Sequence, residues 1–308
     1  MKPTTGDIAS YKLNPSFYPV HKERVGISEF GLDNTNQLIC GGFGLYSSAG
    51  LKPAIGPIKS EFFRIGFCIR GNVHVRCGLE TFHLQPGEIV FTFPGQVFSL
   101  HDKSDDFFAY YMLFSEEFIA GAVSLKKIRD DFPFLNYSGR PCFPLENKEA
   151  AEIQQLFFKI NDELKINDAA LQQTIQLLIH LLLIQANRGY NKLNPSATSS
   201  ENAEHVLLSR YKKSVSQYFI NKRKVTEYAD MLHISSNHLN KVIKKETGKT
   251  AHELIEEMLL LEAKALILHT DLSVAEIGYH LNFADPSHFN KFFKKLSGVT
   301  PLQYRKPE

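Results

Sequence analysis

The sequence predicts an α+β fold with two domains: a β-rich domain that ends in two helices, followed by an all-helical domain. Three observations predict it. Short apolar runs separated by turn residues occupy the first half, two long helical patterns follow them, and the last part of the chain repeats a set of residues. A chain of 308 residues is long enough for two such domains. We expect the first domain at residues 1–190, a linker at 191–204 and the second domain at 205–308.

The β-rich domain is predicted from alternating apolar residues and from turn signals. Between Phe63 and Ile69 every second residue is large and apolar, and Arg64, Gly66 and Cys68 lie between them, which is typical of a half-buried strand. Further apolar runs lie at 73–75, 89–93 and 107–114, and the turn signals are Gly71, Gly78, Pro86-Gly87 and Pro94-Gly95. Short strands with frequent turns favour a sandwich or a barrel.

Two helices are predicted after the strands, at about residues 148–165 and 168–187, from apolar residues at helical spacing. Their apolar stripes predict an antiparallel pair. The second helix is apolar on several faces and therefore needs more than one neighbour. We expect one of these faces to form a homodimer contact, and the alternative is that all of them belong to the core of the domain.

The segment 187–202 is rich in Asn, Ser, Gly and Pro, which are poor core formers, so we expect a flexible linker there.

The C-terminal part of the chain contains an internal repeat, in which ten residues recur in the same order about 50 residues later. Two copies are too few for a solenoid and indicate a paired binding module. The first copy has Val225, Glu227, Leu232, His238, Asn240, Lys241, Lys244, Lys245, Gly248 and Thr250, and the second has Val274, Glu276, Leu281, His288, Asn290, Lys291, Lys294, Lys295, Gly298 and Thr300.

Each copy is predicted to form a short helix, a tight turn and a longer helix. In the longer helices, 236–247 and its counterpart, one face is apolar and the opposite face carries Lys, Asn, Ser and His side chains. Gly248 and Gly298 stand where a helix needs a left-handed C-terminal residue. Both longer helices therefore have a buried side and a basic side that also carries amides.

That polar side suits the major groove of DNA. Asparagine offers a donor and an acceptor to adenine, lysine donates to guanine, and further lysines neutralise phosphates. One such face alone is usually a solvated surface, but its recurrence in the second copy favours DNA binding. The residues expected at base edges are Asn237, Asn240, Lys241, Ser287, His288, Asn290 and Lys291, and those expected at phosphates are Lys244, Lys245, Lys294, Lys295 and Arg305.

A long helix is predicted between the copies, because residues 251–269 contain neither proline nor glycine and are strongly apolar. Its length of roughly 28 Å is close to the approximately 34 Å between successive major-groove faces on one side of B-DNA. We expect this helix both to complete a helical core and to space the two copies along DNA.

The repeat region resembles the AraC/XylS family of bacterial transcription regulators from about Val206 to Lys306. The likeness is densest in residues 271–295, DLSVAEIGYHLNFADPSHFNKFFKK. It implies two helix-turn-helix units joined by a long helix. Three positions depart from the family pattern: Gly278 replaces a usual alanine, and His233 and Asn282 replace the usual turn glycines. His and Asn enter left-handed conformations more readily than most residues, so we expect both turns to form. Gly278 either weakens its helix or permits close packing.

The segment from Gly71 to Gly95 also resembles, less specifically, the cupin barrel with which many proteins of this family sense small molecules. The resemblance implies an effector cavity among the many aromatic residues of the domain. Arg64, Arg70 and Arg76 are available for an anionic group. The residues that we expect to line the cavity are Phe63, Phe67, Arg76, Phe91, Phe93 and Tyr110.

Metal binding and catalysis are not expected. Metal-binding cupins use histidines and a glutamate, whereas Glu61 has no His-x-His beside it and Phe98 stands where a ligand histidine is usual. His74 and His83 fall on the wrong strand for that pattern, and we expect them to be solvated or hydrogen-bonded. The prediction is therefore no metal, no cofactor and no enzymatic activity.

Composition is consistent with a regulator in the bacterial cytoplasm. The four cysteines form no C-x-x-C pair, which favours a reducing compartment. The most apolar run, 177–184, is too short to span a bilayer, and the formal net charge is only +2. The expected partners are double-stranded promoter or operator DNA, an unidentified small-molecule effector and a second copy of the chain. RNA polymerase is a further candidate.

Two alternatives remain open at this point. One is a cupin enzyme with an accessory DNA-binding domain, and the other is a scaffold whose DNA-binding helices have degenerated.

Overall fold

The computed structural model describes residues 10–23, 28–33, 38, 42–120, 125–137, 139–193 and 203–305. Two compact units are found, one over Tyr11–Ile55 and Ser60–Ser200, the other containing Glu201–Glu308. Each is considered separately below. Most of the predicted linker, residues 194–202, lies outside the described residues.

The first unit contains two five-stranded sheets, in the orders β1-β3-β8-β5-β6 and β10-β7-β4-β9-β2. The central pairs in both sheets are antiparallel. The strands are β1 Ser10–Tyr11, β2 Phe43–Ser47, β3 Ile55–Ser60, β4 Phe62–Arg70, β5 Val73–Cys77, β6 Glu80–Leu84, β7 Glu88–Thr92, β8 Val97–His101, β9 Phe108–Ser115 and β10 Cys142–Pro144. The β-rich prediction is therefore confirmed.

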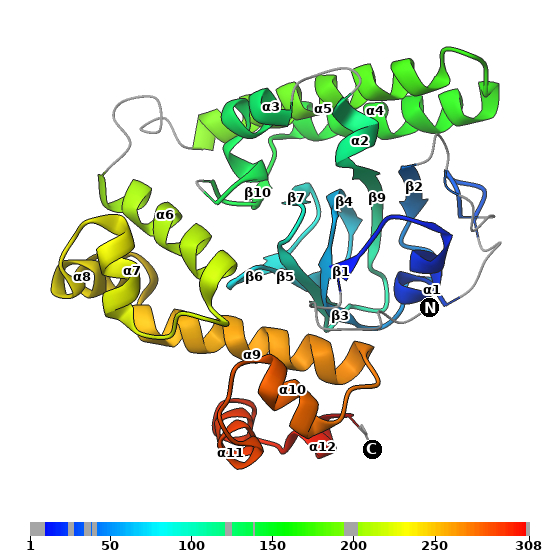
Figure 1. The fold of residues 1–308 in the computed structure, drawn as a ribbon. Coiled ribbons are helices and arrows are strands. Elements are labelled where there is room, and N and C mark those ends of the chain that lie inside the picture. The colour runs from blue at the N-terminus through cyan, green and yellow to red at the C-terminus, as the bar shows by residue number, and fades with distance from the viewer. Residues whose placement is uncertain are drawn as a thin grey trace. The chain divides into compact units, whose positions relative to one another are not determined.

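Helices cover one face of the sheet that contains β4, and the longest of them, α4 and α5, form the predicted antiparallel pair (Figure 1). The helices of this unit are α1 Tyr18–His21, α2 Glu116–Ala120, α3 Leu125–Asp131, α4 Asn147–Ile166 and α5 Leu171–Leu193, with 3-10 turns at Pro15–Phe17 and Pro133–Leu135. The second helix of the pair continues past residue 187, where the sequence predicted its end.

Strand β4 is buried on both faces from Phe62 to Cys68, so the prediction of a half-buried strand is wrong there. Phe63, Ile65 and Phe67 belong to the core between the sheet and its helices. Arg64 and Gly66 face the other sheet, because side chains alternate along a strand. A strand between a helix layer and a second sheet has no face toward solvent. Its side chains point alternately toward the helices and toward the second sheet.

A buried ion pair fixes the N-terminal segment of this unit. Lys22 Nζ lies 2.6 Å from Asp33 Oδ1, and both side chains are about 1% exposed. The same ammonium donates to the backbone oxygens of Ser47 (2.6 Å) and Ala49 (2.5 Å). Asp33 Oδ2 accepts from the Ser47 backbone N–H at 3.1 Å. Burial lowers the pKa of Lys22, and Asp33 opposes that shift. The pair joins the segment after α1 to strand β2.

The second unit is all-helical. Its helices are α6 Ala203–Tyr218, α7 Val225–Leu232, α8 Ser236–Thr247, α9 Ala251–His269, α10 Val274–His280, α11 Pro286–Ser297 and α12 Pro301–Arg305. The bounds of α8 and α9 match the predicted ranges, which confirms both helices. Helix α9 contacts α8 of the first repeat, α10 and α11 of the second, and the flanking helices α6 and α12, so it forms the shared core of the unit (Figure 1).

The buried ion pair gives the first testable prediction. Lys22→Met leaves the Asp33 carboxylate buried without its cation, so we expect a loss of about 3 to 5 kcal/mol in the free energy of unfolding of the first unit. Chemical denaturation of the full chain measures it. Lys165→Met is the control, because Lys165 and its partner Asp162 are both mostly exposed, and little change is expected there. Equal stability of the Lys22 variant and the natural chain would contradict the prediction.

Candidate nucleic-acid interface and effector cavity

The longer helices of the two repeats, α8 and α11, each have one buried face. Leu239, Val242 and Ile243 are buried in α8, and Phe289 and Phe293 in α11. The lysines of both helices lie on the opposite, exposed side, as the sequence predicted. The apolar face seats each helix against its own unit and leaves the polar side chains at the surface.

Local capping fixes where each of these helices begins. The side chain of Ser235 accepts a hydrogen bond from the backbone N–H of His238 at 3.2 Å, and Asp285 accepts from that of Ser287 at 2.5 Å. Such caps satisfy amides that have no partner within the helix. At the other end, Gly248 and Gly298 adopt left-handed conformations with φ of 74° and 84°, as predicted.

The two turns form as expected without glycine. His233 and Asn282 adopt φ values of 58° and 59°, in the left-handed region. Gly278 permits close packing, because a Cβ atom placed on it would lie 3.1 Å from Cβ of Phe289. The departure from the family's alanine is therefore matched by the approach of α11 to α10.

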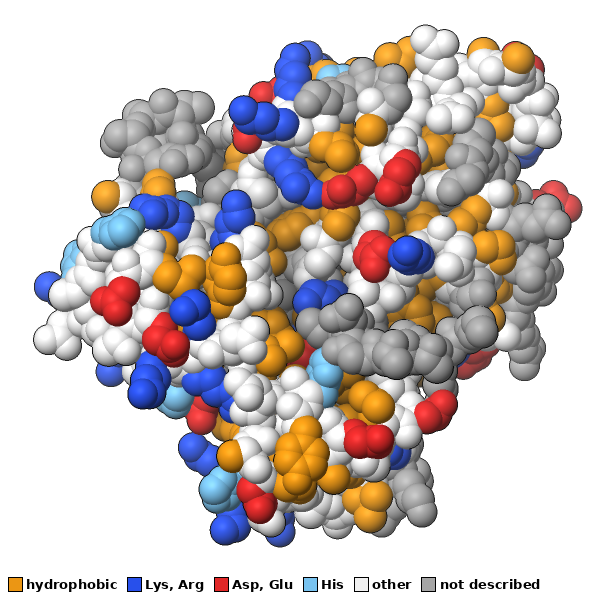
Figure 2. Space-filling view, viewed as in Figure 1, with side chains coloured by type: hydrophobic (Ala, Val, Ile, Leu, Met, Phe, Trp, Pro, Cys, Tyr) orange, Lys and Arg blue, Asp and Glu red, His pale blue; other side chains and the backbone are white. Residues whose placement is uncertain are grey.

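Five of the seven residues predicted at base edges are exposed: Asn237, Lys241, Ser287, His288 and Lys291. Basic side chains are visible over the regions of both α8 and α11 (Figure 2). Within the described part of the chain, neither Lys241 nor Lys291 forms a hydrogen bond or an ion pair. These side chains are available to a ligand at the surface.

The other two, Asn240 and Asn290, are half-buried and bonded within the protein. Asn240 Oδ1 accepts from the Ala251 backbone N–H at 3.1 Å, at the first residue of α9. Asn290 Nδ2 donates to the Pro286 carbonyl oxygen at 2.9 Å. The repeated asparagine therefore has an internal role in each helix, which the sequence did not indicate.

The predicted phosphate-binding residues fall into two groups. The four lysines Lys244, Lys245, Lys294 and Lys295 are exposed. Two of them have acidic neighbours, since Lys245 pairs with Glu204 and Lys295 lies 3.9 Å from Glu256.

Arg305 is half-buried and holds the end of the chain. It donates from Nε to the Ile267 carbonyl at 3.1 Å and from Nη2 to that of Leu272 at 2.6 Å. Its guanidinium ties α12 to the C-terminal end of α9, so phosphate contact is left to its remaining donors.

Sequence reasoning missed Arg223, which joins the two repeats. It precedes α7 in the first repeat, yet its guanidinium donates to the Leu281 carbonyl in the second. The same group lies over the Phe283 ring, 4.3 Å from the centroid. Its position two residues before the repeat starts gave no signal of this contact.

A cavity of about 60 Å³ lies between the two sheets of the first unit. None of the six predicted residues lines it. Phe63, Phe67, Phe91 and Phe93 belong to the core on the helix side of the sheet, and Tyr110 packs against that core. Arg76 alternates with the lining residue Val75 on β5. The lining residues are Phe17, His21, Ser48, Leu51, Ile55, Arg64, Gly66, Val75, Leu84, Val90, Phe98, Leu100, Phe107, Ala109, Tyr111 and Leu113.

The six predicted residues lie outside the cavity for a simple reason. Phe63, Phe67 and Phe91 fill the interior under the helices. The alternate positions of the same sheet carry the small residues Gly66 and Ala109 beside Arg64 and Tyr111. Small residues at alternate positions of an otherwise bulky strand, with one arginine among them, were the available signal.

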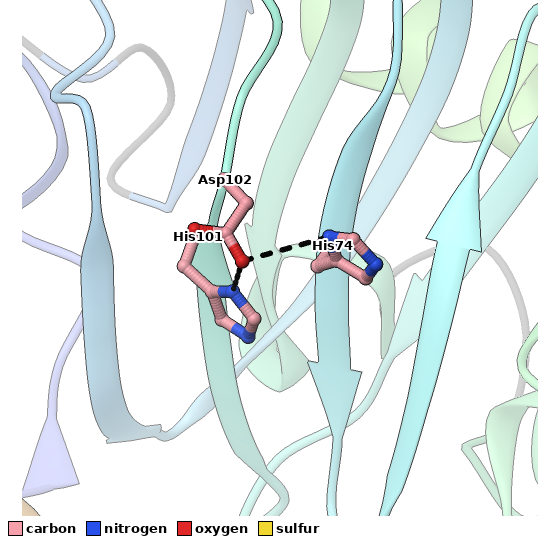
Figure 3. A group of neighbouring side chains, drawn as sticks. All are labelled: His74, His101 and Asp102. Carbon is pink, nitrogen blue, oxygen red and sulfur yellow. Dashed lines mark hydrogen bonds and ion pairs between the residues drawn. The ribbon is translucent and has the colours of Figure 1, made fainter.

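A group of metal-ligating side chains lies on the sheet that contains β5. His74, His101 and Asp102 offer ligand atoms within 4.8 Å of one another (Figure 3). His101 Nδ1 lies 2.9 Å and His74 Nδ1 3.8 Å from Asp102 Oδ2, and the ring of His83 stacks on His74. The sequence considered His74 and His83 but not the other two. All three side chains in the group are at least 40% exposed, and the predicted absence of a metal stays a prediction.

Comparison with known proteins matches both units to families. Residues 54–196 match the AraC-like ligand binding domain, and residues 228–307 match a helix-turn-helix domain. The chain belongs to the AraC family. The resemblance noted in the sequence is thereby confirmed, including its weaker N-terminal part.

Curated relatives include two transcriptional activators. The AraC-family chain is 23% identical to the activator RhaR of Enterobacter sp. (strain 638) over 173 residues, covering 56% of this chain and 60% of the relative. It is 27% identical to the activator RhaS of Escherichia coli O157:H7 over 160 residues, covering 46% and 56%. The chain thus spans less than two thirds of the length of these relatives.

Solved structures include ToxT from Vibrio cholerae, with 14% identity, a TM-score of 0.45 and coverage of 86% of this chain and 98% of that chain. The DNA-binding domain of AdpA in complex with a target DNA matches with 20% identity, a TM-score of 0.30 and coverage of 32% and 88%.

Within the described part of the AraC-family chain, every helix is too short or too polar to cross a membrane.

The internal role of Asn240 gives the second prediction. Asn240→Ala removes the acceptor for the Ala251 N–H, and we expect a loss of about 1 kcal/mol in the stability of the helical unit. Asn240→Asp keeps an acceptor at this helix N-terminus and is expected to retain stability. Chemical denaturation of the full chain compares the two. If Asn240→Ala is as stable as Asn240→Asp, the capping role is refuted.

Proposed function

We propose that this chain is a sequence-specific DNA-binding transcription regulator, controlled by a small molecule that binds in the N-terminal domain. One observation carries the proposal: α8 and α11 each present an exposed lysine at the same position of the repeat, Lys241 and Lys291, on helices seated by a buried apolar face. A helix of this kind fits the major groove, where base edges carry a distinct donor and acceptor code.

The division of labour among the side chains follows from their exposure. Asn237, Lys241, Ser287, His288 and Lys291 are proposed to contact bases, since they are exposed on the recognition helices. Asn240 and Asn290 are also proposed to contact bases, but only with the polar atoms that form no internal bond. These are Nδ2 of Asn240 and Oδ1 of Asn290.

The lysines nearer the helix ends, Lys244, Lys245, Lys294 and Lys295, are proposed to contact phosphates, with Arg305 in a supporting role. Such contacts supply affinity without sequence information and make binding sensitive to salt.

The regulator is proposed to act as a homodimer in the bacterial cytoplasm, without enzymatic activity, and with RNA polymerase as a candidate partner. Most of the apolar face of α5 packs inside its own unit, including Ile175, Ile179 and Leu182. Leu177 and Leu181, one helical turn apart, are 57% and 42% exposed. This strip is the proposed dimer contact.

Effector control rests on differential affinity. A ligand shifts the DNA-bound population only if it binds two arrangements of the regulator with different affinities. The cavity between the sheets is the proposed effector site. The match of residues 54–196 to the AraC-like ligand binding domain supports this assignment.

The proposal predicts a specific defect in Lys241→Ala. Selection of bound duplexes from a random library first defines the preferred site, and titration then measures affinity for that site and for random DNA. We expect a loss of roughly 1 to 3 kcal/mol on the preferred site and little on random DNA. In contrast, Lys244→Ala is expected to weaken binding to both and to reduce the salt slope by about 1.

Lys165→Ala is the matched control, because it removes one exposed lysine from the other unit. An equal loss by Lys241→Ala on both DNAs would reject its base contact. Failure to enrich any sequence would reject the proposed function itself.

A separate prediction concerns the dimer. Leu181→Arg places a charge in the proposed apolar contact, and we expect it to convert dimer to monomer in analytical ultracentrifugation. Ile166→Arg is the control, since Ile166 is also exposed (62%) but lies at the end of α4, off the strip. A dimer unchanged by Leu181→Arg excludes this contact.

A further inference from the structure

The wall of the cavity contains a buried cation, and the described residues supply no anionic partner for it. Arg64 lies in β4 and is 7% exposed. It donates from Nη1 to Thr92 Oγ1 at 3.0 Å, and its guanidinium carbon lies 3.9 Å from the centroid of the Phe98 ring. Among the described residues, no carboxylate forms an ion pair with it. Arginine has five N–H donors, and the contacts above use one.

The charge on this group persists despite its burial. Desolvation lowers the pKa of Arg64 to about 10, so the guanidinium remains protonated at neutral pH. Burying an unpaired charge is unfavourable unless a partner compensates it. The ring of Phe98 compensates it only in part. The site therefore favours occupation by an anion.

Two further polar atoms in the same cavity have no hydrogen-bond partner among the described residues. They are Nε2 of His21 and the hydroxyl of Tyr111, both buried. His21 Nδ1 lies 3.1 Å from the Phe17 carbonyl oxygen. Because a carbonyl only accepts, Nδ1 carries the proton, and burial lowers the pKa of His21 to about 3, so the ring is neutral. The hydroxyl of Tyr111 stays protonated, since burial raises its pKa.

The rest of the lining limits the size and character of the ligand. Ile55, Val75, Leu100 and Leu113 are apolar, so a second charged group on the ligand would have no partner there. A volume of about 60 Å³ accommodates about four water-sized groups. A planar guanidinium matches a carboxylate in shape and charge.

We propose that the cavity binds a short-chain monocarboxylate, with its carboxylate on Arg64 and the Tyr111 hydroxyl and its alkyl group against the apolar wall. This inference rests on the proposed function only in calling the ligand an effector. A phosphate dianion would meet a single cation, and a neutral ligand would leave Arg64 unpaired.

Calorimetric titration of the full chain with propionate and with propionamide tests the proposal, in a buffer free of other carboxylates. The two probes are nearly identical in shape and differ in charge. We expect propionate to bind at least about tenfold more tightly, since hydrogen bonds to charged groups are stronger than neutral ones. Equal binding of the two, or displacement of propionate by chloride at equal concentration, overturns the proposal. This comparison needs no variant.

Arg64→Met and the control Arg76→Met test the residue. Arg76 lies on β5, where it alternates with the lining residue Val75. We expect Arg64→Met to lose the preference for propionate and Arg76→Met to keep it. Without ligand, Arg64→Met is expected to melt at a higher temperature than the natural chain, because an unpaired buried charge has been removed. A lower melting temperature with the preference retained would assign Arg64 a purely structural role.

Operator titration with and without propionate then separates the two hypotheses. Propionate binding without DNA selectivity would reject the proposed function and leave this inference standing. Selective DNA binding without propionate binding would do the reverse.

Discussion

The burial of both faces of the sheet that contains β4 is the constraint on which the first unit depends. Alternate residues along its strands point into two different interiors, one on each face of the sheet. One set of alternate residues, which includes Phe63 and Phe67, packs against α4 and α5 and supplies most of the apolar burial. The other set, which includes Arg64, Gly66 and Ala109, faces the second sheet and leaves the cavity between the two sheets. The apolar packing and the proposed ligand site thereby lie on opposite sides of the same strands, so a substitution on one side leaves the side chains of the other side unchanged.

The helical unit solves a different problem, which is to hold two polar helix faces outward on a small core. Each recognition helix is seated by a few apolar residues and begins at a side-chain cap, Ser235 in one case and Asp285 in the other. The recurrence of a residue in both repeats does not by itself assign it a contact with DNA. Asn240 and Asn290 spend part of their polar capacity inside the protein, whereas Lys241 and Lys291 are fully available at the surface. Repetition in the sequence therefore reflects the requirements of folding, as well as those of the proposed DNA binding.

Helical periodicity and repeat spacing were sufficient to predict the two repeats of the second unit and the bounds of α9. The family resemblance led to the left-handed turns at His233 and Asn282. The β4, β5, β7 and β9 strands of the first unit were also predicted, but the cavity was not. Alternation separates the two faces of a strand without saying which face meets a helix layer, and that choice placed all six predicted lining residues outside the cavity. Contacts between residues far apart in the chain, such as Lys22 with Asp33 and Arg223 with Leu281, have no periodic signal. The predicted DNA contacts remain predictions.

The contact of Arg223 with the second repeat has a mechanical consequence. A guanidinium from the start of one helix-turn-helix unit is held by a backbone oxygen and an aromatic ring of the other, and α9 joins the same two units without a proline or glycine. A rotation of one helix-turn-helix repeat against the other would have to break the Arg223 contact or bend α9. We therefore expect the two repeats to move together. Under the proposed function, DNA that departs from their spacing would have to deform to contact both at once.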